Sequence, residues 1–487
     1  MTTARRVLFA AAEAAPLAKA GGLADVVGSL PQALRERGVD VRIVLPYYRQ
    51  IDAKKFGLRR RAIRFAVPFD GITHIVRLFE TRLPHSRVPV YLLDHPHYEG
   101  AGDIYYQDVR NSAEQRVLQV ERFLFFSRAL PELLRALHWT PHVVHAHDWH
   151  AAAVPFLLRR VGTAALRRVA TVYTIHNLPL QGSISQRRWL ELFGRTEGGS
   201  LPNDALENGT VSLTALGLAS ADALTTVSPT YAREILRPSL GSGFHRLLRK
   251  RRNVLWGVLN GIDTARFDPA HDSAIIPYTA ARLGGKEENA RRLLARARLA
   301  PGRPVFGMVS RLTEQKGIEL VCRILPQLVQ WGCSAVILGS GEPELEERLR
   351  ALAKRFSAHV SVTIGFDAEY AQQIYAGTDC FLMPSVFEPC GLGQMIAMRY
   401  GTIPIVRRTG GLADTVHEGR AGTGFVFSRF AIRDFRAACN RARMAFRDQD
   451  EWQKLQRRAM RQDFSWAASA DQYLAVYQHA QKRHATK

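Results

Sequence analysis

The chain has few cysteines and no long apolar segment. Its 487 residues include five cysteines, all in the second half and without a Cys-x-x-Cys pair, which excludes a disulfide framework and is typical of a reduced, cytoplasmic protein. No segment reaches the roughly 18 consecutive apolar residues of a membrane span. The apolar stretch after Arg6 ends at Glu13, so it predicts a buried strand rather than a signal peptide. We therefore expect a soluble, cytoplasmic protein with no membrane partner.

Lysine is scarce, although the chain is strongly basic. The net charge is +23, and only ten of the 67 basic residues are lysine. The arginines are spread along the chain, as codon bias in a GC-rich genome would spread them, and the sequence contains no recognisable nucleic-acid-binding module. We therefore expect no nucleic-acid partner.

Apolar segments of strand length alternate with helical patterns in both halves. The predicted strands are residues 6–12, 39–45, 142–146, 170–175 and 223–227, then 305–309, 335–338, 360–364, 380–383 and 403–406. This alternation predicts an α/β fold in which parallel sheets carry helices on both faces. We place one domain at 1–255 and another at 256–465, with a hinge near 256–263. The last helix, within 466–487, could pack on either domain.

A short sequence occurs twice. Lys19-Ala-Gly-Gly-Leu-Ala-Asp25 in the first half corresponds to Arg408-Thr-Gly-Gly-Leu-Ala-Asp414 in the second. Each copy follows a predicted strand, precedes a helical pattern and has a base two residues before the glycines. Such a turn leaves backbone N–H groups open at a helix N-terminus, which suits an anion. A single Gly-Gly pair is more often an ordinary turn, but two matching copies favour phosphate binding.

Cations and a carboxylate follow strands in the second half. Arg311 and Lys316 come after the strand 305–309, and Glu388 lies in Phe387-Glu-Pro-Cys-Gly-Leu-Gly-Gln394 after the strand 380–383. Ligands bind at the carboxyl edge of such sheets. Two fixed cations suit the charge that develops on a pyrophosphate leaving group, and the alternative for each residue is a solvated helix start.

The first half is rich in histidine near two strand ends. His145 and His147 share one face of a predicted strand, which is one arrangement for a metal site. No carboxylate cluster or zinc motif accompanies them, so we favour a site without metal. His176 and Asn177 end another strand, where they suit either hydrogen bonds to sugar hydroxyls or a helix cap.

These motifs occur together in one order along nearly the whole chain, and in that order they resemble bacterial glycogen synthases and plant starch synthases. The motifs are Lys19-Ala-Gly-Gly-Leu-Ala-Asp25, His147-Asp-Trp-His150, Thr174-Ile-His-Asn177, Thr226-Val-Ser-Pro-Thr-Tyr231, Asn260-Gly-Ile-Asp263, Ser310-Arg-Leu-Thr-Glu-Gln-Lys-Gly317, Phe387-Glu-Pro-Cys-Gly391 and Thr409-Gly-Gly-Leu-Ala-Asp-Thr415.

The resemblance implies the GT-B architecture of retaining glycosyltransferases, two Rossmann-like domains whose parallel sheets face each other across a cleft. It implies an acceptor-side first domain, a nucleotide-sugar donor domain and a terminal helix that crosses back to the first domain. The expected reaction is transfer of glucose from ADP-glucose to the non-reducing end of an α-1,4-glucan such as glycogen, with retention of configuration. No metal and no cofactor are expected. A related enzyme with UDP-glucose or another acceptor is the alternative.

The resemblance also assigns residue roles. Arg311 and Lys316 would neutralise the donor diphosphate, and Glu388 and His176 would hold the donor glucose, which makes these four the expected catalytic residues. The other expected substrate-binding residues are Lys19, Gly21, Gly22 and Asp25 in the first glycine turn, Asp148, Asn177 and Asn260 on the sugar and acceptor side, Phe366 against the adenine, and Cys390, Gly391 and Leu392 around the phosphates.

The sequence offers one obvious carboxylate for the chemistry. Many retaining GT-B enzymes carry Glu-x7-Glu, but the residue eight positions after Glu388 is Ile396. A double displacement needs two acids, so we favour front-face substitution. Three positions depart from the family pattern: Gly393 replaces Thr or Asn, Thr214 replaces Lys and Leu180 replaces Tyr. The loop between Val416 and Gly424 is also short. A non-catalytic glucan-binding protein is disfavoured because the charged residues are intact.

Overall fold

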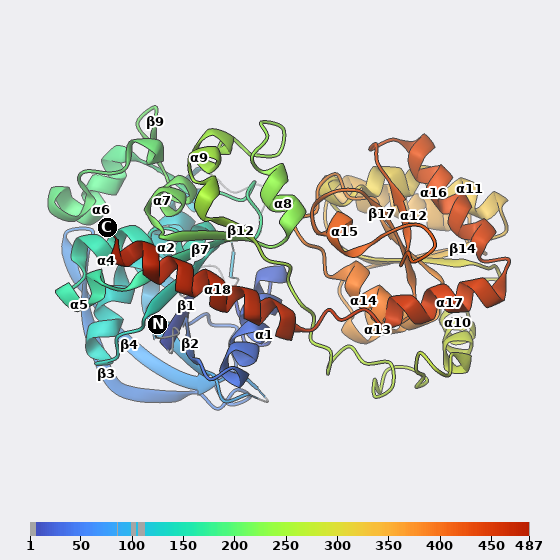
Figure 1. Ribbon diagram of the computed structural model, residues 1–487, viewed down its shortest axis with the longest axis horizontal. Coiled ribbons are helices and arrows are strands. Elements are labelled where there is room, and N and C mark those ends of the chain that lie inside the picture. The colour runs from blue at the N-terminus through green and yellow to red at the C-terminus, as the bar shows by residue number, and fades with distance from the viewer. Residues whose placement is uncertain (1–5, 85, 99–103, 106–112, 487) are drawn as a thin grey trace. The chain divides into compact units, whose positions relative to one another are not determined.

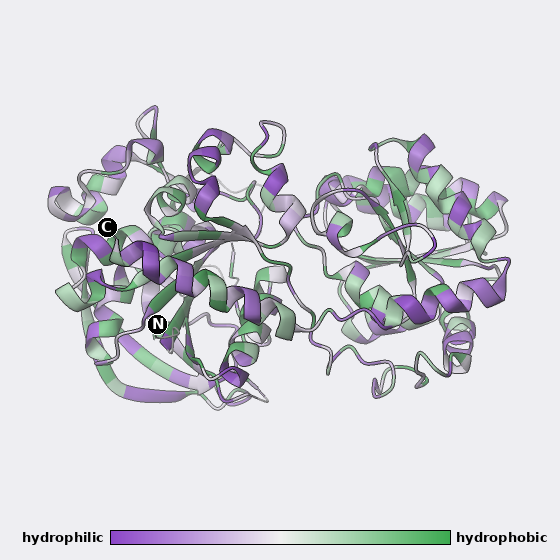
Figure 2. Ribbon diagram, in the orientation of Figure 1, coloured by the Kyte–Doolittle hydropathy of each residue, from purple (hydrophilic) through white to green (hydrophobic). Residues whose placement is uncertain are grey.

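The structure is a computed structural model that describes residues 6–84, 86–98, 104–105 and 113–486. The chain forms two compact units, Met1–Gly261 with Trp466–Lys487, and Ile262–Ser465. Figure 1 shows the elements of each unit, and Figure 2 shows that apolar residues concentrate on the strands within them. Among the described residues, no helix has both the length and the apolar character needed to cross a membrane.

The first unit is built on a twisted sheet with the strand order β12-β11-β7-β6-β1-β2-β5-β4-β3. Its strands are β1 (Arg6–Ala10), β2 (Asp40–Pro46), β3 (Arg59–Phe69), β4 (Ile72–Arg82), β5 (Pro89–Asp94), β6 (Val143–His147), β7 (Ala170–Ile175), β11 (Ala223–Thr226) and β12 (Leu255–Gly257). The short strands β8 (Ser183–Ser185), β9 (Leu206–Glu207) and β10 (Thr210–Ser212) form a separate small sheet.

Helices cover both faces of this sheet. They are α1 (Gly22–Glu36), α2 (Ala113–Ala136), α3 (Asp148–Ala151), α4 (Val154–Val161), α5 (Ala164–Arg167), α6 (Gln186–Gly198), α7 (Leu213–Ser220), α8 (Pro229–Glu234), α9 (His245–Lys250) and α18 (Trp466–Ala485). The buried side chains of α1 and α18 join one core cluster, and those of α2, α4 and α7 join another. An apolar layer on each face is what a central parallel sheet requires.

The terminal helix α18 packs on the first unit. Trp466, Tyr473 and Tyr477 are buried in the same core cluster as side chains of α1, and Figure 1 shows α18 running beside α1. Their spacing of seven and four residues puts them on one face of the helix. The strand β12 pairs with β11, so residues 256–261, which the sequence placed in the second domain, lie with the first.

The second unit has one parallel sheet with the order β15-β14-β13-β16-β17-β18. Its strands are β13 (Val305–Val309), β14 (Ser334–Gly339), β15 (Val360–Ile364), β16 (Cys380–Met383), β17 (Ile403–Arg407) and β18 (Phe425–Phe427). Its helices are α10 (Gly284–Arg296), α11 (Ile318–Gln330), α12 (Pro343–Arg355), α13 (Ala368–Gly377), α14 (Gly393–Arg399), α15 (Gly410–Thr415), α16 (Ile432–Ala445) and α17 (Gln449–Met460).

The α/β class and the strands predicted from the sequence are confirmed, with ends that shift by one or two residues. Strands β5, β8, β9, β10, β12 and β18 were not predicted, nor was the antiparallel pair β3 and β4 at one edge of the first sheet. Its strands are half exposed, so they lack the continuous apolar pattern of the buried strands. The Arg59-Arg60-Arg61 cluster begins β3, with all three side chains in solvent. The five cysteines, all within the described chain, are buried and unpaired.

Candidate active site

In both sheets, loops that carry candidate site residues follow strands at a reversal of strand order. In the first unit β1 lies between β2 and β6, and in the second β13 lies between β14 and β16. At such a point the loops that leave neighbouring strands run in opposite directions, which opens a crevice at the carboxyl edge. The loops after β1 and β6 carry Lys19 and Asp148, and those after β13 and β16 carry Arg311 and Glu388.

Hydrogen bonds to the buried carboxylate of Glu13 anchor the first glycine turn. The Oε2 of Glu13, which is 3% exposed, accepts the backbone N–H of Ala20 at 2.7 Å and of Gly21 at 2.8 Å, and Tyr105 donates its hydroxyl to Oε1. The N–H groups of Ala20 and Gly21 are therefore engaged by Glu13 and are not open to a ligand. The N–H groups of Gly22 and Leu23, in the first turn of α1, lack intrahelical acceptors by the geometry of a helix start.

The two glycines of this turn are not required by the fold. Gly21 has an extended backbone, with φ at −148°, and a Cβ built on Gly21 or Gly22 would meet no atom within 4 Å. The turn therefore presents bare backbone to open space, which is what close approach of a ligand requires. Beside it, the Nζ of Lys19 lies 2.6 Å from Oδ1 of Asp25, so Asp25 orients the lysine.

The second copy of the glycine sequence has a different role. Gly410 has φ at +43°, and a Cβ there would lie 1.8 Å from the carbonyl oxygen of Glu388. A Cβ on Gly411 would lie 2.1 Å from the carbonyl oxygen of Cys390, and the Gly411 N–H donates to the Glu388 carbonyl at 3.1 Å. These glycines let α15 pack against the Glu388 turn, so the second copy supports the position of that turn.

Asp148 and His176 come together at the ends of β6 and β7. Asp148 has φ at +54° and accepts the backbone N–H of His176 at 2.7 Å. Burial raises the pKa of Asp148 to about 7, although the N–H of His176 opposes the shift. Burial lowers the pKa of His176 to about 3, so its imidazole is neutral near pH 7 and can accept or donate a hydrogen bond.

The two histidines of β6 make two separate sets of buried hydrogen bonds. His147 Nδ1 lies 3.0 Å from Nε2 of His176, while the two ring nitrogens of His145 lie 3.0 Å from the Tyr477 hydroxyl and 2.6 Å from Thr174 Oγ1. Both nitrogens of His145 are therefore committed to hydrogen bonds. The pair His145 and His147 ties α18 to β7 and orients His176, which gives these residues a role that needs no metal.

Two asparagines on the first unit carry unsatisfied oxygens. The Oδ1 atoms of Asn177 and Asn260 are buried and lack a hydrogen-bond partner among the described residues. A buried amide oxygen without a partner costs about 1–3 kcal/mol, so each oxygen is suited to a hydroxyl or water from outside the chain. Asn177 follows β7, and Asn260 follows β12 on the same edge of the sheet.

In the second unit Lys316 and Glu388 are in direct contact. The Lys316 Nζ lies 2.6 Å from Glu388 Oε2, which also accepts the Ser385 hydroxyl at 3.0 Å. The two loops are joined by the Val386 N–H, which donates to the Gln315 carbonyl at 2.8 Å. Gly317 allows the two loops to approach closely, because its φ is +70° and a Cβ there would lie 2.1 Å from the Pro384 carbonyl oxygen.

The other predicted residues of the second unit differ in burial and in their contacts. Gly391, at φ +73°, follows buried Cys390 and precedes Leu392, the residue that caps α14. The guanidinium of Arg311 is exposed and forms no ion pair with any described residue. Phe366, after β15, is 80% exposed and makes no ring contact with the described aromatics. Neither Arg311 nor Phe366 contacts Lys316 or Glu388.

The structure also explains one departure from the family pattern. A Cβ on Gly393 would lie 3.2 Å from the Phe381 ring, so a larger residue there requires that ring to shift. Thr214 is buried on α7, and Leu180 is 52% exposed. Glu13 and Ser385 were missed by sequence reasoning. The only signal for Glu13 was a lone acid that interrupts an apolar segment, and none marked Ser385.

Comparisons with known proteins agree with this geometry. The family described as "Starch synthase catalytic domain" matches residues 6–250, and "Glycosyl transferases group 1" matches residues 291–458. Glycogen synthase 2 of Geobacter sulfurreducens is 38% identical, covering 98% of this chain and 99% of that protein. Glycogen synthase of Cellvibrio japonicus is 42% identical, with 97% and 98% covered.

A solved structure shows the same similarity. The catalytic domain of starch synthase IV from Arabidopsis thaliana, bound to ADP and acarbose, superposes with a TM-score of 0.89 at 32% identity. The match covers 99% of this chain and all of that chain. The resemblance seen in the sequence is confirmed, and the fold is of the GT-B class. The chain belongs to the glycogen and starch synthase family and is a glucosyltransferase of that type.

Proposed function

We propose that this enzyme transfers glucose from ADP-glucose to the non-reducing end of an α-1,4-glucan, with retention of configuration and release of ADP. The observation that carries the proposal is the Lys316–Glu388 pair at the carboxyl edge of the second sheet, with the unpaired Arg311 guanidinium on the same loop as Lys316. ADP and acarbose are bound to the starch synthase IV domain that matches this chain, which supports an adenine nucleotide as donor.

The donor belongs to the second unit in this proposal. Arg311 and Lys316 hold the diphosphate, the N–H groups around Gly391 and Leu392 add donors, and Phe366 stacks on the base. An aromatic ring that is 80% exposed offers a free face to a planar ligand. Backbone and side-chain donors placed where charge develops are the main means of stabilising such a leaving group.

The reaction proceeds on one face of the sugar. The bond between C1 of glucose and the diphosphate oxygen breaks, and the oxygen keeps the electron pair. The acceptor hydroxyl forms its bond to C1 on the same face, and its proton passes to that phosphate oxygen. Glu388 binds glucose hydroxyls, while Lys316 bridges the carboxylate and the diphosphate and stabilises the charge that leaves.

In the first unit, two sets of residues suit an acceptor sugar and a phosphate. Lys19, oriented by Asp25, and the bare turn at Gly21 and Gly22 suit a phosphate. His176, Asn177 and Asn260 present neutral polar groups, two of them with unsatisfied oxygens, and such groups suit sugar hydroxyls. Asp148 holds the backbone of His176 in place.

The test measures incorporation of labelled glucose into glycogen from ADP-glucose and, separately, from UDP-glucose. We expect ADP-glucose to be the better donor, and Glu388→Gln to lower kcat by more than about a hundredfold. The control is Glu451→Gln, which breaks an exposed 2.7 Å pair with Lys454 in the same unit and should leave activity unchanged. A preference for UDP-glucose would overturn the donor assignment, and a fully active Glu388→Gln variant would overturn the site.

A further inference from the structure

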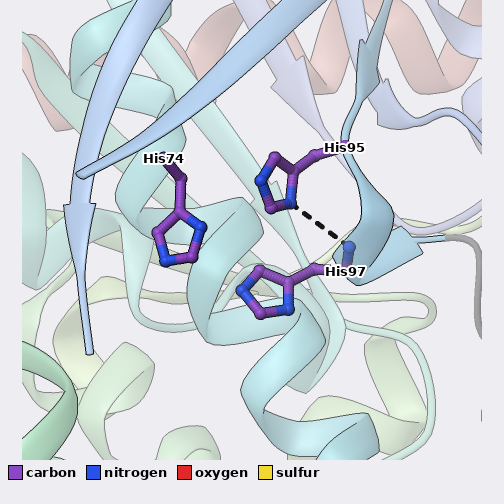
Figure 3. A group of neighbouring side chains, drawn as sticks. All are labelled: His74, His95 and His97. Carbon is purple, nitrogen blue, oxygen red and sulfur yellow. Dashed lines mark hydrogen bonds between the residues drawn. The ribbon is translucent and has the colours of Figure 1, made fainter. Parts of the chain in front are cut away.

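Three histidines converge in the first unit, on elements other than those that carry the candidate active site. His74 lies on β4, His95 directly follows β5, and His97 lies in the short 3-10 helix Pro96–Tyr98. A nitrogen from each ring lies within 4.8 Å of the nitrogens of the others. The ring centroids form a nearly equilateral triangle with sides of 5.0, 5.0 and 4.9 Å (Figure 3).

The sheet itself produces this juxtaposition. β4 and β5 are antiparallel neighbours, and Arg77 pairs with Asp94 at the end of β5. His74 lies three residues before Arg77 on β4, whereas His95 and His97 follow the end of β5. The pairing of β4 with β5 therefore brings the segment that carries His95 and His97 close to His74.

Hydrogen bonds select the nitrogens that remain available. His74 Nε2 lies 3.2 Å from the carbonyl oxygen of Phe69 and donates its proton there, which leaves the lone pair on Nδ1. An imidazole anchored on a carbonyl by its second nitrogen is the usual arrangement of a metal-binding histidine. His95 Nδ1 accepts the His97 N–H in a long 3.2 Å bond (Figure 3). The other nitrogen, Nε2, lies on the side of the ring toward His74 (Figure 3), and a metal there would require the proton to move to Nδ1, with loss of this bond.

The surroundings define the kind of ion. The Phe125 ring lies 4.6 Å from the His95 and His97 rings and 5.3 Å from the His74 ring, which shields one side from water. The carboxylates of Asp70 and Glu121 are engaged by Arg188, at 2.8 and 2.7 Å. Three imidazoles without a carboxylate suit zinc-type transition ions and not Mg²⁺ or Ca²⁺, which prefer oxygen.

We propose that His74, His95 and His97 bind one Zn²⁺-class ion, with water in the fourth position. The ion links residues 95–98 to β4, and its role is structural and independent of the transfer reaction. Packing alone would account for aromatic rings beside Phe125, but it would not require one nitrogen of each ring to lie within 4.8 Å of the others.

The experiment uses the full chain, freed of any affinity tag and treated with chelator. Zn²⁺ is titrated against a chromophoric chelator, and Co²⁺ is added separately to follow its visible absorption. We expect one tight site per chain, an intense Co²⁺ spectrum of tetrahedral type and a higher Tm with Zn²⁺. His97→Asn should weaken binding by more than about tenfold, and His74→Gln/His97→Asn should abolish it.

The matched control is His271→Asn, since His271 is exposed and pairs with Asp268 in the other unit. This variant should bind Zn²⁺ as the wild type does. Activity in the glycogen-labelling assay, measured for metal-free wild type and for His97→Asn, shows that both chains are folded. His97 reaches solvent, so its replacement should leave the core intact. The proposal fails if wild type binds no Zn²⁺ beyond the double variant, or if Zn²⁺ raises the Tm of both equally.

Discussion

The ammonium of Lys316 lies 2.6 Å from the carboxylate of Glu388, and the two residues come from loops that follow different strands of the second sheet. Ser385 donates to the same carboxylate oxygen at 3.0 Å. The other oxygen, Oε1, has no hydrogen-bond partner among the residues that the structure describes. One side of Glu388 is thus fixed by the protein, and the other is available to a substrate hydroxyl.

Replacing Lys316 separates binding from catalysis. Lys316→Gln keeps an unbranched polar side chain, one atom shorter than lysine, but removes the charge, so we expect kcat to fall about 10²- to 10³-fold. Lys316→Arg restores charge but not the compact geometry of an ammonium, and it should recover only part of the rate. Steady-state kinetics with varied ADP-glucose checks both. A Gln variant with normal kcat and a raised donor KM would show that Lys316 only binds.

The two glycine turns should respond differently to the same change. Gly21→Ala adds a methyl group that meets no protein atom, so we expect an unchanged Tm and a donor KM raised by roughly tenfold or more, since the methyl group occupies the space of the ligand. Gly411→Ala places its Cβ 2.1 Å from the Cys390 carbonyl oxygen and should cost about 1–3 kcal/mol of stability.

Thermal unfolding and kinetics of both glycine variants form the comparison. Gly411→Ala should also lower kcat, because the displaced turn carries Glu388. If Gly21→Ala lowers the Tm as much as Gly411→Ala does, the first turn is structural and its assignment to phosphate is wrong.

Phe366 should affect only the donor. Its ring is 80% exposed, so Phe366→Ala costs little stability, and the loss of base stacking, about 1–3 kcal/mol, should raise the ADP-glucose KM with little change in kcat. Phe366→Tyr keeps a stacking ring and should behave as the wild type does. Met444→Ala, at another exposed apolar side chain of this unit, is the control. An unchanged KM in Phe366→Ala would remove this residue from the donor site.

The buried histidines should make the enzyme sensitive to acid. Burial lowers the pKa values of His150 and His176 to about 3, well below the 6.5 of an exposed imidazole. Between these values the unfolded chain binds more protons than the folded chain. Stability is therefore lost as pH falls below about 6.5, by up to about 1.4 kcal/mol per pH unit for each histidine. Asp148, whose pKa is raised to about 7, contributes in the opposite direction.

His150→Phe isolates one of these contributions. His150 stacks on Tyr105 at 5.0 Å, and its Nδ1 has no partner among the described residues, so a phenyl ring can occupy the site. Urea unfolding at pH 7 and pH 5 should show a smaller loss of stability in His150→Phe than in wild type. Equal losses in the two proteins would mean that His150 does not titrate on unfolding.

Local patterns were sufficient for the class of fold and for most of the candidate residues. Buried parallel strands are continuous apolar segments, so β1, β6, β13 and β16 could be found without tertiary information. The loops that follow such strands carry Lys19, Arg311 and Glu388, and their place in the sequence alone indicated an anion site. The half-exposed strands β3 and β4 left no comparable pattern and were missed.

Only the tertiary structure distinguished the two copies of Gly-Gly-Leu-Ala-Asp. Their sequences are alike, but one faces open space and the other packs on the Glu388 turn, because what surrounds a glycine is set by elements distant in the chain. The triangle of His74, His95 and His97 likewise joins residues of β4 and of the segment after β5. The sequence determined which residues were present at the strand ends, and strand register decided which of them met.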